Sequence, residues 1–240
     1  MQGREGKLPI REQISSWDVC RDRRLLNAVD GFEKAARTHG ISLILDDDFR
    51  AFKRFNKCLD KLALTPNFDP DTSTLDSRHG FWMKGVDRMG RIVMTQAARQ
   101  YDCNAISVAG LHETLRAFYT DPGDQAETGE VCRSRAPAAY AIAGNVCYHG
   151  ELWLAPPYRG RGLTDPLPKL LMALVLLKWA PSYLFGMAQP GIVIKGVAQR
   201  YGYRNMQPGG MIWTVPSRGT LDEWILWNDL DQLYATVMQA

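Results

Sequence analysis

The sequence lacks the features that mark a secreted, membrane or metal-binding protein. Its five cysteines are widely spaced and form no C-x-x-C pair, which argues against a disulfide framework and against a zinc ribbon. The longest apolar run, residues 170–177, is far shorter than the roughly 20 residues of a membrane-spanning helix. Residues 1–10 are polar and contain no apolar signal-peptide core. We therefore expect a cytoplasmic protein with no metal site and no membrane contact.

No charge of one sign dominates either. The formal net charge is +3, the pI is about 8.6, and the charged residues are scattered along the chain. This balance is at most a faint indication of a polyanionic partner. There is no internal repeat and no low-complexity tract. A length of 240 residues with 45% hydrophobic composition suits one folded unit with a substantial core.

One segment, residues 152–164, has a pattern that points to a ligand. Leu152 and Leu154 alternate with Trp153 and Ala155 as in a strand with two different faces. Two prolines then remove two backbone donors, so the strand must end and the chain must turn. The segment therefore predicts a strand that leads directly into a turn.

The turn itself has the composition of an anion site. Gly160 and Gly162 lack a Cβ, so main-chain N–H groups can approach an anion closely, while Arg159 and Arg161 can neutralise it. A helix should follow from Pro166, capped by the preceding Thr or Asp, with its positive end directed at the turn. This order favours a nucleotide or pyrophosphate ligand.

The stretch from Arg159 to Thr164 resembles the R/Q-x-x-G-x-G/A motif of the GNAT acyltransferases, which hold the pyrophosphate of acyl-coenzyme A with it. Thr164 stands where that family usually has Gly or Ala. The resemblance implies acetyl-CoA or another acyl-CoA as cosubstrate. It implies donor-binding roles for one residue of the strand and six of the turn, namely Leu154, Arg159, Gly160, Arg161, Gly162, Leu163 and Thr164.

The resemblance also implies the fold, an α/β (α+β) architecture with a mixed, mostly antiparallel central sheet and flanking helices. Its middle should be splayed, with the acyl-CoA between the motif strand and the next strand. We expect a first strand at 41–45, a helix at 49–62, a hairpin of 81–87 with 91–101, a strand at 182–187, a helix at 191–201 and a last strand at 211–215.

The predicted elements divide the chain into three parts. Residues 1–40 form an N-terminal helical extension, 41–215 the acyltransferase-like domain, and 216–240 a C-terminal helix packed on the domain. The pattern from Thr220 to Glu223 resembles a capping box and starts that helix, which either covers the sheet or makes a homodimer contact. Residues 65–79 and 120–137 read as loops that flank the acceptor pocket, the second of them a mobile excursion.

Acyl transfer to an amine needs a bound donor, a neutral nucleophile and a group that protonates the departing thiolate. Glu151 and His149, on the motif strand, are the candidates for the general base, unless Glu151 is an exposed strand end and His149 a turn residue. The family's proton donor is a helix tyrosine whose position falls on Ala198 here, so Tyr201 or Tyr203 would have to substitute.

Cys147 and Cys103 are nucleophile candidates only where a base and a positive environment lower the pKa of the thiol. In the absence of such a setting, each is a packing residue.

We therefore predict an acyl-CoA-dependent N-acyltransferase, with acetyl transfer to an unidentified primary amine as the leading reaction. The first alternative is a non-catalytic acyl-CoA sensor, favoured by the missing helix tyrosine. A more distant alternative is a nucleic-acid-associated protein that uses its glycine–arginine loop on phosphates. Trp17 with Arg21, Arg23 and Arg24 is a separate candidate for nucleic-acid contact, although a solvated helix face explains the same charges.

Overall fold

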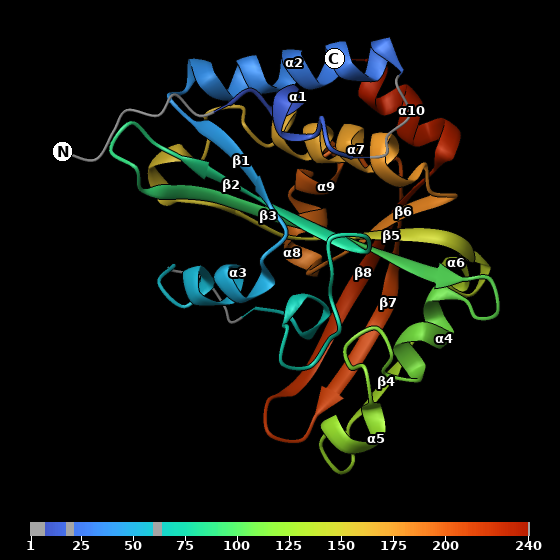
Figure 1. Cartoon of the computed structure of the whole chain (residues 1–240). Helices are drawn as coiled ribbons and strands as arrows, with labels where there is room; N and C mark the ends of the chain where they lie inside the picture. Colours follow the sequence, from blue (N-terminus) through green and yellow to red (C-terminus); the bar gives the residue numbers. More distant parts are fainter. Residues whose placement is uncertain (1–7, 18–21, 60–63, 240) are drawn as a thin grey trace.

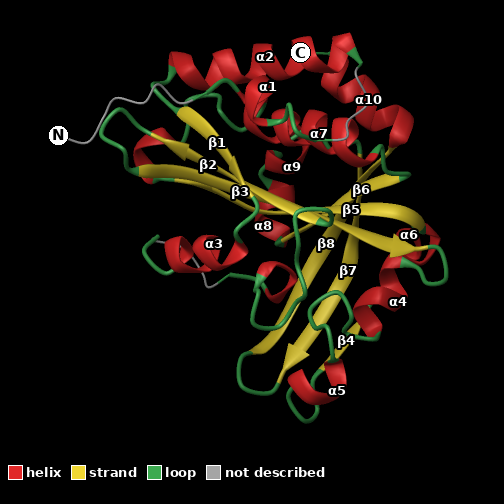
Figure 2. Ribbon diagram, in the orientation of Figure 1, coloured by secondary structure: helices red, strands yellow, loops and turns green. Residues whose placement is uncertain are grey.

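One eight-stranded sheet carries the architecture of the computed structural model, which describes residues 8–17, 22–59 and 64–239. Its strand order is β1-β2-β3-β5-β6-β8-β7-β4, and helices cover both faces (Figures 1 and 2). The strands are β1 Ser42–Asp46, β2 Gly80–Val86, β3 Ile92–Cys103, β4 Val131–Arg133, β5 Gly144–Leu154, β6 Tyr183–Ala188, β7 Asn205–Val215 and β8 Gly219–Asp229.

The helices in the described part of the chain range from single turns to four turns. They are α1 Ile10–Gln13, α2 Arg23–Thr38, α3 Phe49–Asn56, α4 Val108–Glu113, α5 Pro122–Gln125, α6 Pro137–Ala141, α7 Pro166–Trp179, α8 Pro190–Ile194, α9 Val197–Arg200 and α10 Leu230–Met238, with 3₁₀ turns η1 Pro66–Phe68 and η2 Pro156–Tyr158. Among these helices, none combines the length and the apolar composition that a membrane span requires.

Every neighbouring pair of strands is antiparallel except β5 and β6, so the expected mixed, mostly antiparallel sheet with flanking helices is confirmed. The parallel pair is short, because only Val146–Tyr148 of β5 is paired with Tyr183–Phe185 of β6. Beyond this point β5 continues beside β3 and β6 continues beside β8. The sheet is therefore splayed at its middle, as expected.

A β-bulge in β5 accompanies this separation. Thr95 and Ala97 of β3 are paired with Trp153 and Gly150 of β5, so β5 carries one extra residue between these pairs. Glu151 lies in this bulge and has a left-handed φ of 59°. A bulge bends its strand and increases the local twist, which turns the end of β5 away from β6.

Two hydrophobic layers lie on the two faces of the sheet. The first holds α2, α7 and α10, and α7 is apolar all round because it is enclosed between the sheet and α2. The second layer is rich in stacked rings, with Phe52 4.6 Å from Trp82 and Phe118 4.3 Å from Trp213 between ring centroids. The two layers fix the sheet from both sides.

The predicted strands at 41–45, 81–87, 91–101 and 182–187 are confirmed within one or two residues. The predicted N-terminal helices are present as α1 and α2, and Arg21 lies outside the described residues. The helix expected at 49–62 ends at Asn56, and residues 60–63 lie outside the described part. The helix expected at 191–201 is split into α8 and α9, since Gly196 has a left-handed φ of 67° between them.

The predicted C-terminal region is wrong in its first half. Thr220 to Glu223 lies in β8, so it caps no helix, and 211–215 is only the end of β7, which is followed by another strand. Trp224 and Leu226 pack in one layer while Ile225 and Trp227 pack in the other, which is the alternation of a strand. The capping box that does form joins Asp229 and Gln232 at the start of α10.

Residues 120–137, expected as a mobile excursion, are instead tied into the fold. They contain α5 and β4, and β4 extends the sheet by pairing with β7. The buried carboxylate of Glu130 accepts hydrogen bonds from Tyr119 Oη at 3.0 Å and from Trp213 Nε1 at 2.8 Å. These bonds anchor the segment because a buried carboxylate must keep its donors.

Gly210 should be essential for the pairing of β7 with β8. A Cβ at this position would lie 2.4 Å from the main-chain nitrogen of Ile225, and backbone cannot move aside without parting the strands. We expect Gly210→Ala to lower the free energy of unfolding by about 2 to 3 kcal/mol, measured by urea denaturation. Gly191→Ala is the matched control, because its Cβ would meet nothing within 4 Å, and a similar loss in both variants would contradict this explanation.

Candidate functional site

A cleft opens where β5 and β6 separate, with a volume of about 720 Å³. Its walls come from the second half of β5, the end of β6, α8 and β8, which lie together at the centre of the molecule (Figure 1). The ionisable and aromatic residues among its lining are Tyr148, His149, Glu151, Trp153, Arg159, Tyr201, Tyr203 and Glu223. The cleft therefore gathers the predicted acid–base candidates Glu151, His149, Tyr201 and Tyr203.

The glycine–arginine loop lies at the mouth of this cleft, since Arg159 belongs to both. Gly160 and Gly162 have left-handed φ values of 72° and 79°, and a Cβ on either would meet no atom within 4 Å. Within the described structure, the five main-chain N–H groups of residues 160–164 donate no hydrogen bond to the protein. Consecutive main-chain donors without a protein partner are the groups that anion-binding turns use, so the turn of residues 160–164 is a candidate anion cradle.

The start of α7 differs in detail from the expected cap. Asp165 occupies the N-cap position but its side chain accepts no capping bond, and it forms an ion pair with Lys169 at 2.7 Å instead. Pro166 stands at the first helical position, as predicted. Because Pro166 and Pro168 carry no N–H, the free donors belong to the loop, and the helix adds its dipole.

The two leucines of the motif lie beneath the loop. Leu154 and Leu163 are 8% and 1% exposed, and both belong to the core around α7. The carbonyl of Leu154 accepts a hydrogen bond from Arg159 Nε at 2.8 Å, which fixes the end of the strand to the loop. Arg161 extends over the ring of Tyr158, 5.6 Å from its centroid. The leucines hold the loop from below while the guanidinium groups stay exposed.

His149 is buried in the cleft wall rather than in a turn. Its Nδ1 lies 3.1 Å from the hydroxyl of Tyr203, and its Nε2 has no hydrogen-bond partner in the described structure. Burial lowers the pKa of His149 to about 4, so the ring is neutral at pH 7. A neutral, unpartnered nitrogen can bind a ligand group, but it is a weak base.

Glu151 lies on the bulge of β5 and its carboxylate is engaged. Its Oε1 accepts a hydrogen bond from the main-chain nitrogen of Thr65 at 2.8 Å, and its carbonyl accepts one from Thr95 Oγ1 at 3.1 Å. The side chain therefore joins the loop of residues 65–79 to the cleft wall. Glu151 therefore stabilises the fold in addition to lining the cleft.

Glu223 is the residue that sequence reasoning missed. It projects from β8 into the cleft and, in the part of the chain that the structure describes, forms no hydrogen bond or ion pair. Burial raises its pKa to about 7. The available signal was the strand alternation of residues 223–227, which would have put Glu223 on the same face as the buried Ile225.

The remaining candidate residues, the tyrosines and cysteines, differ in whether they can take part in catalysis. Tyr201 is half-buried in the cleft, and burial raises its pKa, as it does for Tyr203. Burial also raises the pKa of Cys147 well above its ordinary value and that of Cys103 to about 11, so both remain thiols and neither is an activated nucleophile. Ala198, at the position of the family's tyrosine, is fully buried in the core.

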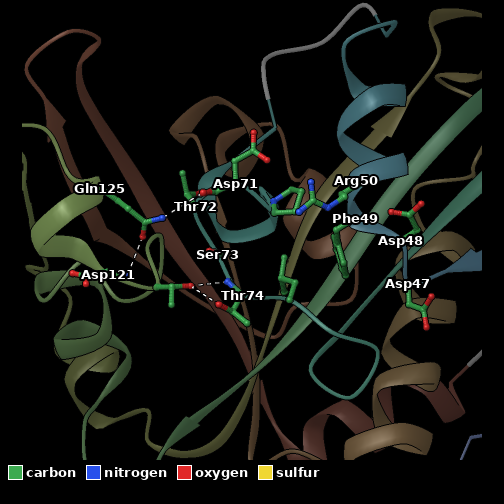
Figure 3. Close-up of a pocket in the computed structure, with 13 residues that line it drawn as sticks. Asp47, Asp48, Phe49, Arg50, Asp71, Thr72, Ser73, Thr74, Asp121 and Gln125 are labelled. Carbon is green, nitrogen blue, oxygen red and sulfur yellow. Dashed lines mark hydrogen bonds between the residues drawn. The ribbon is translucent and has the colours of Figure 1, made fainter.

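The two loops expected beside the acceptor pocket meet each other at a separate hollow of about 540 Å³ (Figure 3). Thr74 and Thr120 bond side chain to side chain at 2.9 Å, and Gln125 Nε2 donates to the carbonyl of Asp71 at 3.3 Å. The hollow shares no lining residue with the cleft. Its aspartates form no metal site, since no group of three or more potential ligands occurs among the described residues.

Of the N-terminal residues considered for nucleic-acid binding, Trp17 is partly buried, Arg23 and Arg24 are exposed, and Arg21 lies outside the described residues. The ring of Trp17 lies 5.2 Å from that of Phe81, and Lys178 Nζ lies 4.3 Å from its centroid. Arg24 lies over the ring of Tyr234. The indole is thus already in contact with Phe81 and Lys178.

No protein-family model and no curated protein sequence matches this chain. Several solved structures are similar in fold. Arabidopsis thaliana NAA60 in complex with acetyl-CoA has a TM-score of 0.45 and 11% identity, over 79% of this chain and 99% of that one. A variant of the spermidine N-acetyltransferase SpeG from Vibrio cholerae has a TM-score of 0.44 and 7% identity, over 82% of this chain and 97% of that one.

A complex of AAC(6')-Ib with acetyl-CoA has a TM-score of 0.44 and 14% identity, over 81% of this chain and 96% of that one. These proteins are GNAT acetyltransferases, the family that the Arg159–Thr164 loop resembles. Because the identities are 14% or less and the TM-scores are 0.45 or less, the chemistry of the site depends on the residues of this chain.

Proposed function

We propose that this protein transfers an acyl group, in the first instance acetyl, from coenzyme A to a primary amine. The observation that carries the proposal is the main-chain anion cradle of residues 160–164 at the mouth of the central cleft. Five unpaired N–H groups, two adjacent arginines and the positive end of α7 match the 5′-diphosphate of coenzyme A. Membership of the GNAT superfamily is part of this proposal.

The open edge of β5 suits the rest of the donor. Beyond Tyr148, β5 has no partner strand on the side of β6, so main-chain groups on that edge can bind an extended chain. The pantetheine arm of coenzyme A is such a chain, with two amide groups along its length. A donor held by the cradle and by this edge would direct its thioester into the cleft.

The two ends of the cleft offer different chemistry. His149 shares its face of the sheet with Cys147 and Tyr203, on the side of α7. Glu223 shares the opposite face with Ile225 and Tyr148. We place the donor on the α7 side and the amine on the side of the two carboxylates, Glu223 and Glu151, where an ammonium group is attracted.

The reaction requires the loss of a proton before attack. In the proposed sequence the carboxylate of Glu223 takes a proton from the ammonium, directly or through a water, and the neutral amine forms a C–N bond to the thioester carbonyl. The C–S bond then breaks, the nitrogen loses its second proton to give the amide, and the departing thiolate takes a proton in exchange. Tyr201 is the candidate donor, and His149 can donate from Nε2 when the Tyr203 hydroxyl donates to Nδ1. Holding the two reactants in one cleft supplies the remaining rate enhancement.

The alternative proposal is a protein that binds acyl-CoA without turnover. Ala198 at the position of the family's tyrosine and Thr164 in the loop favour it. A panel of primary amines with acetyl-CoA separates the two, because a transferase releases free thiol only when a suitable amine is present. Tight coenzyme A binding without amine-dependent thiol release would support the sensor.

Gly162→Val should abolish donor binding while leaving the fold intact. A β-branched residue is strained at a φ of 79°, and its side chain would enter the open space over the cradle. We expect at least about a tenfold loss of coenzyme A affinity by isothermal titration calorimetry. Gly219→Val is the matched control, because Gly219 has a φ of 88° and open surroundings in the β7–β8 turn. Equal affinity in a folded Gly162→Val variant would contradict the cradle.

Glu223→Gln should remove the pH dependence of the reaction. With a pKa of about 7, the carboxylate is the base above neutrality, so kcat/KM should rise with pH through 7 in the natural protein. We expect the variant to lose about 10²-fold or more in kcat and to lose this rising limb. Asp222→Asn, whose side chain pairs with Arg135 at 2.9 Å on the exterior, is the control. If Glu223→Gln keeps the pH profile of the natural protein, Glu223 is not the general base and Glu151 is the next candidate.

The same substitution should stabilise the protein at high pH. The raised pKa means that the folded protein holds a proton that the unfolded chain has lost between about pH 4.5 and 7. Stability therefore falls as pH rises across this window, by at most about 1.4 kcal/mol per pH unit. We expect Glu223→Gln to unfold at a higher temperature than the natural protein at pH 8 and at the same temperature at pH 4. Equal values at pH 8 would show that burial does not penalise this carboxylate.

A further inference from the structure

A second basic hollow adjoins the anion cradle on the side away from the cleft. It has a volume of about 370 Å³ and lies between the end of α2, the β2–β3 hairpin and the loop. His39 comes from the end of α2, Arg88 from the hairpin, and Tyr158 and Arg161 from the loop. Because Arg161 belongs to both the loop and this hollow, a ligand seated on the cradle has direct access to it.

The arginines that line the hollow differ in whether a carboxylate neutralises them. Arg91 is neutralised by Asp87, whose carboxylate it contacts at 2.7 Å. Arg88 forms no hydrogen bond or ion pair in the described structure, and its Nε lies 3.5 Å from the Cβ position of Gly40. Arg161 also lacks a carboxylate partner there and contacts the ring of Tyr158. Two unpaired guanidinium groups from distant parts of the sequence therefore line one hollow.

We propose that this hollow, with Arg88 as its defining residue, binds the 3′-phosphate on the ribose of the coenzyme A donor. The inference rests on the proposed function and adds a second anion site to it. A phosphate monoester carries about −1.5 to −2 charges at pH 7 and presents three acceptor oxygens. Guanidinium groups match such an ion with paired N–H donors. The cradle would hold the diphosphate of the same ribose, and Arg161 would lie between the two.

The geometry explains why the hairpin contributes to the site. β3 runs antiparallel to β5, so the start of β3, where Met94 is paired with Leu154, lies beside the end of β5. The β2–β3 turn is thereby brought next to the loop that follows β5 (Figure 1). The left-handed glycine at position 90 closes this turn with a φ of 79°, and the turn presents Arg88 to the hollow.

The test compares coenzyme A with 3′-dephospho-coenzyme A, which keeps the diphosphate and the pantetheine arm. By isothermal titration calorimetry, the natural protein should bind coenzyme A at least about tenfold more tightly than the dephosphorylated form. In Arg88→Ala this ratio should fall toward one, with little change for the dephosphorylated form. Arg78→Ala is the control, because Arg78 is exposed and pairs with Asp76 away from the loop.

The possible results are distinguishable. Equal affinities for the two nucleotides in the natural protein would overturn this inference and leave the proposed function intact. Binding of neither nucleotide would overturn both. If the nucleotides bind equally while inorganic phosphate binds in an Arg88-dependent manner, the hollow takes a separate phosphate, and the assignment to the donor is wrong. Arg88 is exposed, so the variant should fold, and its thermal unfolding should match that of the Arg78 control.

Discussion

The short parallel contact between β5 and β6 is the constraint on which the rest of the molecule depends. Three residue pairs join the two halves of the sheet, and beyond them the bulge at Glu151 turns β5 away. Gly186 allows the backbones to stay close where the separation begins, since a Cβ there would lie 3.2 Å from the carbonyl of His149. A longer pairing would close the cleft and occupy the open main-chain edge of β5.

The electrostatic arrangement follows from this opening. Arginines and unpaired amides gather at the end of β5, whereas the carboxylates Glu151 and Glu223 lie on the opposite side. Positive and negative groups therefore lie at different ends of one cleft, which is the arrangement that the proposed anionic donor and cationic acceptor require. Burying Glu223 without a partner costs stability, and the pairing of β8 with β6 and β7 keeps it in the cleft wall. A strained or costly feature of this kind is typical of a functional site.

Much of the loop could be predicted because its chemistry is local. Gly160, Gly162 and Pro166 impose their turn and helix start through their own backbone preferences, whatever surrounds them. The central strands were also predictable, since their alternating side chains reflect burial on two faces. The capping box at Thr220 was misread because one polar pattern can begin a helix or continue a strand, and the pairing of β8 with β6 and β7 decides between them.

The amino-acid sequence by itself determined the glycine–arginine turn and the order of the strands and helices around it, because these depend on residues within a few positions of one another. Only the tertiary structure decided which groups line the cleft and the hollow beside it. Glu223 and Arg88 lie 72 and 63 residues from Glu151 and are brought to the two ends of the site by strand pairing alone. The environment of each is made by distant elements, so no local pattern can reveal a raised carboxylate pKa or an unpaired guanidinium group.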